Sequence, residues 1–204
     1  YYACNINNYD KSSIKMIVPG HGDASRTEGL VRNLKKISSS FSKRFLFTCH
    51  VFLYNKITFP FDCEKTYSKG LWTDFMKQVN YYDYDYYILM MDDVYLQKPT
   101  VENMIDTMKN YNLNVAAPSL TSWHWKIMEQ NSSCILRKTN YLDMLFTIFT
   151  KDAFQCWSNQ IDLKNNNYGW GYDVTFKKKC NVDMGILDNF LAIHTSGEAR
   201  GSKR

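Results

Sequence analysis

Long apolar runs are missing from this sequence of 204 residues. None approaches the roughly 20 residues that a helix needs to cross a bilayer, so we expect no membrane span in this chain. Repeats and low-complexity stretches are missing too, and a hydrophobic content of 45% with 22% charged residues excludes a disordered chain. The net charge is only +5, and the basic residues are spread along the sequence, so we expect no nucleic-acid partner.

Metal-cluster spacing is absent among the six cysteines, because no two of them form a Cys-x-x-Cys pair, and this argues against a zinc site. Cys49 lies in the apolar stretch FLFTCHVFL, which is typical of a buried free thiol and favours a reducing, cytoplasmic compartment. Three disulfides are the alternative. Because the chain begins at Tyr1 and not at methionine, it is interpreted as an excised piece of a longer protein, with room for further domains beyond residue 204.

Strand-like and helix-like segments alternate along the chain. Apolar and β-branched runs predict strands at 15–18, 44–54, 86–91, 113–117, 142–149 and 184–194. Apolar residues at helical spacing predict helices at 24–40, 64–80, 100–111, 151–163 and 171–180. This alternation is typical of a mostly parallel, Rossmann-like central sheet with helices on both faces, so we expect a single α/β domain.

Two acidic pairs flank the apolar run 86–91. Asp83 and Asp85 precede the run, whereas Asp92 and Asp93 follow it. Ligands of open α/β sheets gather beyond the carboxyl ends of the strands, so the later pair is expected at a site and the literal Asp-x-Asp is not. Neighbouring carboxylates repel each other unless a cation neutralises them, which predicts bound manganese or magnesium. The alternative is an ordinary turn, where aspartate is common.

The stretch YGWGYDVTF, residues 168–176, is the second chemical feature. Glycines on both sides of Trp170 allow a sharp backbone bend that brings the indole against a ligand. Asp173 then falls in the first turn of a helix, where it could act as a general base; helix capping is the alternative. His194 ends a late apolar run, 191–193, and is either a hydrogen-bonded structural residue or, near an acidic pair, a metal ligand.

Taken in this order, the features resemble the GT-A class of nucleotide-sugar glycosyltransferases. The match comprises the first-strand loop Val18–Asp23, the strand-end pair Asp92-Asp93, the Gly-Trp-Gly-x-Asp element Gly169–Asp173 and the late Ile193-His194. The chain also looks like the glycosyltransferase domains with which chloroviruses, large DNA viruses of algae, decorate their capsids. That likeness implies the host cytoplasm, with the Golgi lumen (its anchor removed) as the alternative localisation.

The resemblance implies a nucleotide-binding half at about 1–117 and an acceptor-side half at about 118–204. In that class a divalent metal, manganese or magnesium, holds the donor diphosphate. The sequence departs from the family pattern at Met91, which stands where the first acid of Asp-x-Asp would be. Carried over by position, the implied metal ligands are Asp93, Asp92 and His194. The implied donor contacts are Pro19, Gly20, His21, Asp23, Arg26, Asp92, Asp93 and Arg200. Asp173 matches the base of inverting members.

Three tryptophans, Trp123, Trp125 and Trp170, are candidates for a wall that stacks on an acceptor sugar, although tryptophan is often simply buried. The sequence therefore predicts a metal-dependent glycosyltransferase that moves a hexose of the glucose or rhamnose type from a UDP-sugar to a glycan or glycoprotein. We expect inversion, with Asp173 as base. The alternatives are a retaining transferase of the same fold, a sugar nucleotidyltransferase and a non-catalytic carbohydrate-binding module.

Overall fold

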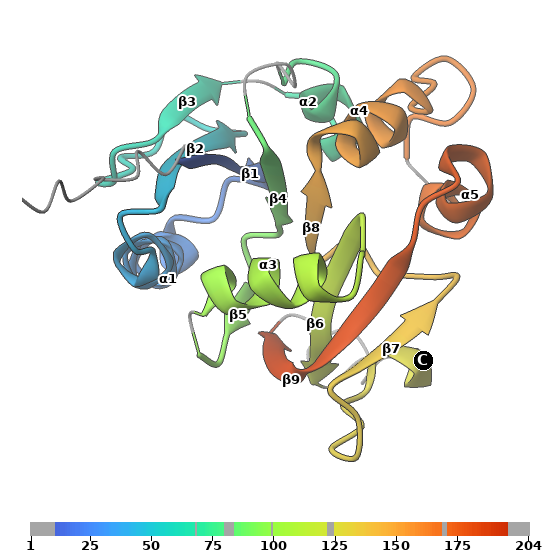
Figure 1. The fold of residues 1–204 in the computed structure, drawn as a ribbon. Coiled ribbons are helices and arrows are strands. Elements are labelled where there is room, and N and C mark those ends of the chain that lie inside the picture. Colours follow the sequence, from blue (N-terminus) through green and yellow to red (C-terminus); the bar gives the residue numbers. More distant parts are fainter. Residues whose placement is uncertain are drawn as a thin grey trace, which may run out of the picture.

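A computed structural model describes residues 11–67, 69–79, 84–98, 100–121, 125–168 and 171–195. One mixed sheet runs through the molecule in the order β3-β2-β1-β4-β8-β6-β9-β5, and β7 pairs with β9 outside this path (Figure 1). The strands are β1 (Ser12–His21), β2 (Phe45–Leu53), β3 (Glu64–Tyr67), β4 (Tyr86–Met90), β5 (Val94–Leu96), β6 (Val115–Thr121), β7 (Leu136–Thr139), β8 (Phe146–Thr150) and β9 (Met184–His194). The helices are α1 (Ala24–Ser40), α2 (Trp72–Met76), α3 (Val101–Asn110), the short 3-10 helix η1 (Lys126–Met128), α4 (Lys151–Asn159) and α5 (Tyr172–Cys180).

Helices cover both faces of the sheet, which confirms the predicted α/β class. Side chains alternate between the faces along a strand, so Tyr87 and Met90 of β4 point to opposite sides. Tyr87 stacks on Phe154 of α4 with ring centroids 4.2 Å apart. On the other face, Met90 Sδ accepts a hydrogen bond from Asn33 Nδ2 of α1 at 3.4 Å. In Figure 1, α1 and α3 accordingly lie together on one side of the sheet and α4 lies on the other.

Strand directions bring several carboxyl ends to one edge of the sheet. β1 pairs in parallel with β2 and β4, and β6 pairs in parallel with β9. β8 is antiparallel to both β4 and β6, so β4 and β6 run the same way. The ends of β1, β4, β6 and β9 therefore open at the same edge, which is where ligands of α/β sheets bind.

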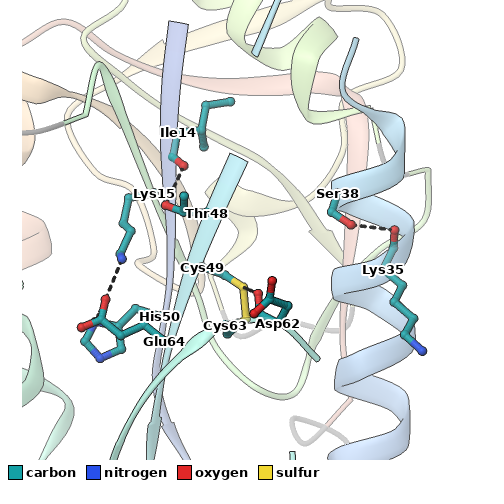
Figure 2. Close-up of a disulfide and its surroundings, with 10 residues drawn as sticks. All are labelled: Ile14, Lys15, Lys35, Ser38, Thr48, Cys49, His50, Asp62, Cys63 and Glu64. Atoms are coloured by element: carbon teal, nitrogen blue, oxygen red, sulfur yellow. Dashed lines mark hydrogen bonds and ion pairs between the residues drawn. A yellow bond between two sulfur atoms is a disulfide. The ribbon is translucent and has the colours of Figure 1, made fainter. Parts of the chain in front are cut away.

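The prediction of one helix over 64–80 is wrong. Residues 64–67 form β3, and only Trp72–Met76 is helical. β3 pairs in parallel with β2, and a disulfide between Cys49 and Cys63 fixes the residue before it to that strand (Figure 2). Lys15 of β1, with 7% exposure, adds an ion pair of 2.8 Å to Glu64. These tertiary contacts outweigh the helical spacing of the apolar residues.

The cysteines also differ from the prediction, because Cys49 is not a free thiol. It is buried as expected, but it forms the disulfide with Cys63, and a second disulfide joins Cys156 of α4 to Cys180 of α5. Cys134 is free. The second disulfide matters for the site, since it fixes α5 to α4.

Of the helices in the described ranges, none is long and apolar enough to cross a membrane.

A buried ion pair anchors the far half of the sheet. The Asp188 carboxylate of β9 is fully buried and accepts hydrogen bonds from Arg137 Nε at 2.8 Å and Arg137 Nη2 at 2.9 Å. Ser119 Oγ and the Asn131 amide each donate to Asp188 Oδ1 at 2.8 Å. Arg137 also donates to the carbonyls of Ile127 and Glu129. One network thus joins β6, β7, β9 and the segment that begins at η1.

Asp188→Ala should lower the free energy of unfolding by about 3–5 kcal/mol, because it leaves Arg137 without its buried partner. Arg32→Gln, which removes the exposed pair with Glu28, should cost under about 1 kcal/mol. Urea unfolding of both variants measures the difference. Equal costs would contradict the anchoring role.

The same network predicts an acid-sensitive fold. Burial alone would raise the pKa of Asp188, but hydrogen bonds from Arg137, Asn131 and Ser119 outweigh it and hold the pKa below its ordinary value. A lowered folded-state pKa stabilises the protein above the unfolded value of about 3.9, and this stability is lost as pH falls through the folded pKa. Urea titrations from pH 6 downward should show the loss in the native protein and a smaller loss in Asp188→Asn.

Candidate active site

Three strand ends meet around the pair Asp92-Asp93. His21 ends β1, the aspartates follow β4, and His194 ends β9. The turn at the aspartates leads into β5, where Val94 lies opposite His194 in the antiparallel register. The Thr195 amide closes this junction by donating to the Asp93 carbonyl at 3.0 Å. The acidic pair therefore lies at the carboxyl edge of the sheet, where the strand-end argument predicts it, and His194 lies beside it.

The carboxylate of Asp92 is held by a buried histidine, His21. The ring of His21 is fully buried, and its Nδ1 lies 2.9 Å from Asp92 Oδ2. The other ring nitrogen, Nε2, lies 2.9 Å from Thr27 Oγ1 on α1. With both nitrogens engaged, His21 fixes the orientation of the Asp92 carboxylate. The resemblance assigns His21 to the donor, but its ring is fully buried and both of its nitrogens face protein atoms.

Asp93 points toward a different partner. Its Oδ2 lies 3.3 Å from His194 Nε2, and both side chains are largely buried. Arg26 of α1 reaches both aspartates, with Nη1 at 3.5 Å from Asp92 Oδ1 and 3.7 Å from Asp93 Oδ2. The guanidinium thus balances the charge of two adjacent carboxylates, which would otherwise repel each other.

The pair Asp93–His194 fits a divalent cation. Two neighbouring ligand atoms of an octahedral ion lie about 3 Å apart, given bond lengths of about 2.1 Å. The separation of 3.3 Å between Asp93 Oδ2 and His194 Nε2 is close to this value. In the described part of the chain, no group of three or more His, Cys, Asp or Glu side chains is arranged to hold a metal. A cation here would need further ligands, such as substrate phosphates, and Asp92 as a third ligand stays a prediction.

The predicted first-strand loop begins later than expected. Pro19, Gly20 and His21 belong to β1, and Pro19 is buried, so the loop starts at Gly22. The strand continues because β1 pairs with β2 as far as His21, across a bulge after Val18. Pro19 is therefore a buried part of the strand, and the structure does not support a contact between Pro19 and the donor.

Tyr54, which the sequence did not single out, covers this end of β1. Gly20 has φ +122°, and a Cβ there would lie 2.3 Å from Tyr54 Oη, so a larger residue would displace the ring. Burial and then the charge of Asp92 raise the pKa of Tyr54. The half-exposed ring thus lies near the acidic pair and offers a flat apolar face.

Asp23 has a local structural role. It is the N-cap of α1, and its Oδ1 accepts a hydrogen bond from the Ser25 amide at 2.9 Å. Its Oδ2 lies 3.2 Å from Arg26 Nε. By capping the helix and holding the guanidinium, Asp23 helps direct Arg26 toward the acidic pair.

A pocket of about 210 Å³ opens beside the end of β4. Its lining includes Trp72, Met91, Asp143, Leu145, Tyr168 and Asp173. Met91 precedes the acidic pair, and its amide donates to the Leu145 carbonyl at 2.9 Å. Asp173 therefore lies at the same edge of the sheet as the pair Asp92-Asp93. Spacing alone gave no signal for Trp72 or Asp143, since they come from unrelated segments.

Asp173 lies in the first turn of α5, as predicted. Gly171, the N-cap, has φ +82°, the left-handed conformation that favours glycine. The Asp173 carboxylate is partly exposed and accepts a hydrogen bond from the Val174 amide at 2.9 Å. Burial, followed by the carboxylates of Asp143 and Asp173, raises the pKa of Tyr141, so its hydroxyl stays a donor.

Asp85 of the earlier acidic pair lies elsewhere, as the strand-end argument requires. Asp85 Oδ2 accepts hydrogen bonds from the Ser13 amide at 2.7 Å and from Ser13 Oγ at 2.9 Å, at the beginning of β1 and not at its end. Trp125 is 54% exposed, and its ring centroid lies 5.7 Å from that of Tyr141, which suits an acceptor wall. Four other candidate residues, Asp83, Trp123, Trp170 and Arg200, lie outside the described residues.

No protein-family model and no curated protein matches the sequence. Solved structures do match in fold. A structure of GalNAc-T7 with UDP, GalNAc and Mn²⁺ has a TM-score of 0.60 at 8% identity, over 92% of this chain and 44% of that one. A structure of S. aureus TarS 1-349 in complex with UDP has a TM-score of 0.55 at 11% identity, over 91% of this chain and 61% of that one. The chain thus has a GT-A-like fold and spans about half the length of these proteins.

The disulfide Cys156–Cys180 should hold the Asp173 helix in place. It closes a loop with a sequence separation of 24 residues, so replacing both cysteines by serine should cost about 3 kcal/mol. Amide exchange should quicken most within α5, because the few buried side chains of this helix, Tyr172 and Phe176, are then its main attachment. The control is Cys134→Ser, which removes a free cysteine. Unchanged exchange in α5 would contradict this role.

Proposed function

We propose that this chain is a metal-dependent glycosyltransferase that moves a hexose, of the glucose or rhamnose type, from a UDP-sugar to a glycan or glycoprotein acceptor. The observation that carries the proposal is the meeting of an acidic pair, a histidine and Asp173 at one edge of a GT-A-like sheet. The fold alone would not support it, since one fold hosts many functions. The resemblance to chlorovirus glycosyltransferase domains belongs to this proposal as well.

The charges of the side chains at the proposed donor site explain the role of each residue. Asp93 and His194 would hold the cation, and a bound cation would stabilise the negative charge that builds up on the departing diphosphate. Arg26 lies beside the same carboxylates and could turn its guanidinium toward the diphosphate. Tyr54 offers a face for the uracil or ribose. His21 keeps Asp92 oriented throughout.

Asp173 supplies the second half of the reaction. Its carboxylate lines the pocket next to β4 and would take the proton from the acceptor hydroxyl as that oxygen attacks the anomeric carbon. Burial and then the charges of Asp143 and Asp173 raise the pKa of Tyr141, so its hydroxyl stays protonated near this carboxylate. Attack from the side of Asp173, opposite the departing diphosphate, inverts the configuration.

Two observations bear on the alternatives. A nucleotidyltransferase needs basic groups that cradle a triphosphate after the first strand. Residues 22–27, which follow β1, offer Arg26 alone, and it already lies beside two carboxylates. A non-catalytic carbohydrate-binding module gives no reason for an acidic pair held by a buried histidine.

The two disulfides favour an oxidising compartment, such as the Golgi lumen, over the cytoplasm as the proposed localisation.

Asp93→Ala should abolish manganese-dependent binding of UDP, because it removes a cation ligand. Asp85→Ala should cost stability, since Ser13 loses its acceptor, but should leave UDP affinity unchanged. Isothermal titration with UDP, with and without Mn²⁺, measures both variants. If the two variants lost affinity equally, the assignment of the donor site to the end of β4 would fail.

Asp173→Asn should keep UDP affinity within about twofold and reduce transfer at least about 100-fold, since an amide cannot accept the proton. The measurement is UDP release from a panel of UDP-sugars in the presence of an acceptor mixture. A matched change is Asp162→Asn, an aspartate that caps a nearby turn through the Lys164 amide at 3.0 Å. Full turnover in Asp173→Asn would remove its role as base.

A further inference from the structure

A groove lined by lysines lies along α5, the helix that carries Asp173. It consists of two adjoining hollows of about 350 and 600 Å³ that share Asn140 and Lys177. Lys138 of β7 lines the first, and Lys178 of α5 lines the second. We call this surface the lysine groove and define it by Lys138, Asn140, Tyr141, Lys177 and Lys178.

Two residues of the lysine groove relate it to the proposed base. Tyr141 lines the first hollow, and burial followed by the charges of Asp143 and Asp173 raises the pKa of its hydroxyl. Lys177 lies one helical turn after Asp173 in α5, so both side chains project from the same side of the helix. The strands that carry Asp92, Asp93 and His194 contribute nothing to its lining, so the groove belongs to the acceptor side of the base and not to the donor site.

Charge on this surface is uncompensated. Across the ranges that the structure describes, Lys138, Lys177 and Lys178 take part in no ion pair, in contrast to Lys15. Lys177 Nζ donates to the Thr139 carbonyl at 3.3 Å, which holds the amine at the groove floor without neutralising it. Asp183 is the one carboxylate among the described lining residues. Three amines along one groove suit a bound anion.

We propose that the lysine groove binds a negatively charged substituent of the acceptor glycan, such as a phosphate, a sulfate or a uronic acid carboxylate. Tyr141 and the exposed ring of Trp125 would contact the sugar face while the lysines read the charge. The proposal rests on the proposed function, because it treats the groove as the acceptor subsite of that reaction. It narrows the acceptor to an anionic glycan.

The test uses one fluorescent trisaccharide in four forms: neutral, and carrying one phosphate, one sulfate or one uronic acid. The variant is Lys138→Gln/Lys178→Gln, which removes one exposed amine from each hollow. The control is Lys35→Gln/Lys36→Gln, which removes the same charge from an exposed turn of α1. Titrations at physiological salt measure trisaccharide binding, and UDP binding with Mn²⁺ is measured in parallel.

We expect at least one charged form to bind about tenfold tighter than the neutral form, and the groove variant to lose that advantage while the control keeps it. Equal losses in both variants, or equal binding of a short DNA oligonucleotide, would overturn the proposal, because either result indicates non-specific attraction. Failure of the native protein to bind UDP would instead count against the proposed function. If UDP binding were intact but the charged trisaccharides bound no tighter than the neutral one, only the inference about the acceptor would be contradicted.

Discussion

The repulsion between two adjacent carboxylates, Asp92 and Asp93, is the constraint on which this site depends. The structure resolves it by giving each aspartate a different partner. Buried His21 holds Asp92 and His194 lies beside Asp93, while Arg26 reaches both. One carboxylate is thereby fixed to the protein scaffold, and the other is the one that would share a cation with a ligand in the proposed function. In that proposal the half-exposed guanidinium provides positive charge that would shift toward a bound diphosphate.

The acidic pair lies at the sheet edge because of the strand directions. Asp173 is held in place by other contacts. β4 and β9 run the same way only because β8 is inserted antiparallel between β4 and β6. Asp173 depends instead on α5, a helix with few buried side chains that the disulfide to α4 and the Tyr172 hydroxyl attach to the domain. The acidic pair and the base can therefore be disturbed independently, which is useful for separating donor binding from transfer.

The buried ion pair Arg137–Asp188 also stabilises segments that lead to the lysine groove. The buried pair Arg137–Asp188 joins β7 and β9 and also binds the carbonyls of Ile127 and Glu129. Those residues adjoin Trp125, and β7 carries Lys138 into the lysine groove. A stability element is thus continuous with the proposed acceptor surface. Solved structures with 8–14% identity share the fold.

The sequence by itself determined the α/β alternation, the strand-end position of Asp92-Asp93 and the placement of Asp173 at a helix start, because periodicity and chain order are local properties. It misjudged residues 64–80 and Cys49, since pairing of β3 with β2 and the bond to Cys63 involve segments that spacing does not connect. Only the tertiary structure decided which aspartate His21 holds, that Tyr54 covers Gly20 and that Tyr141 lies near Asp173. Those relations depend on which distant segments the sheet brings side by side.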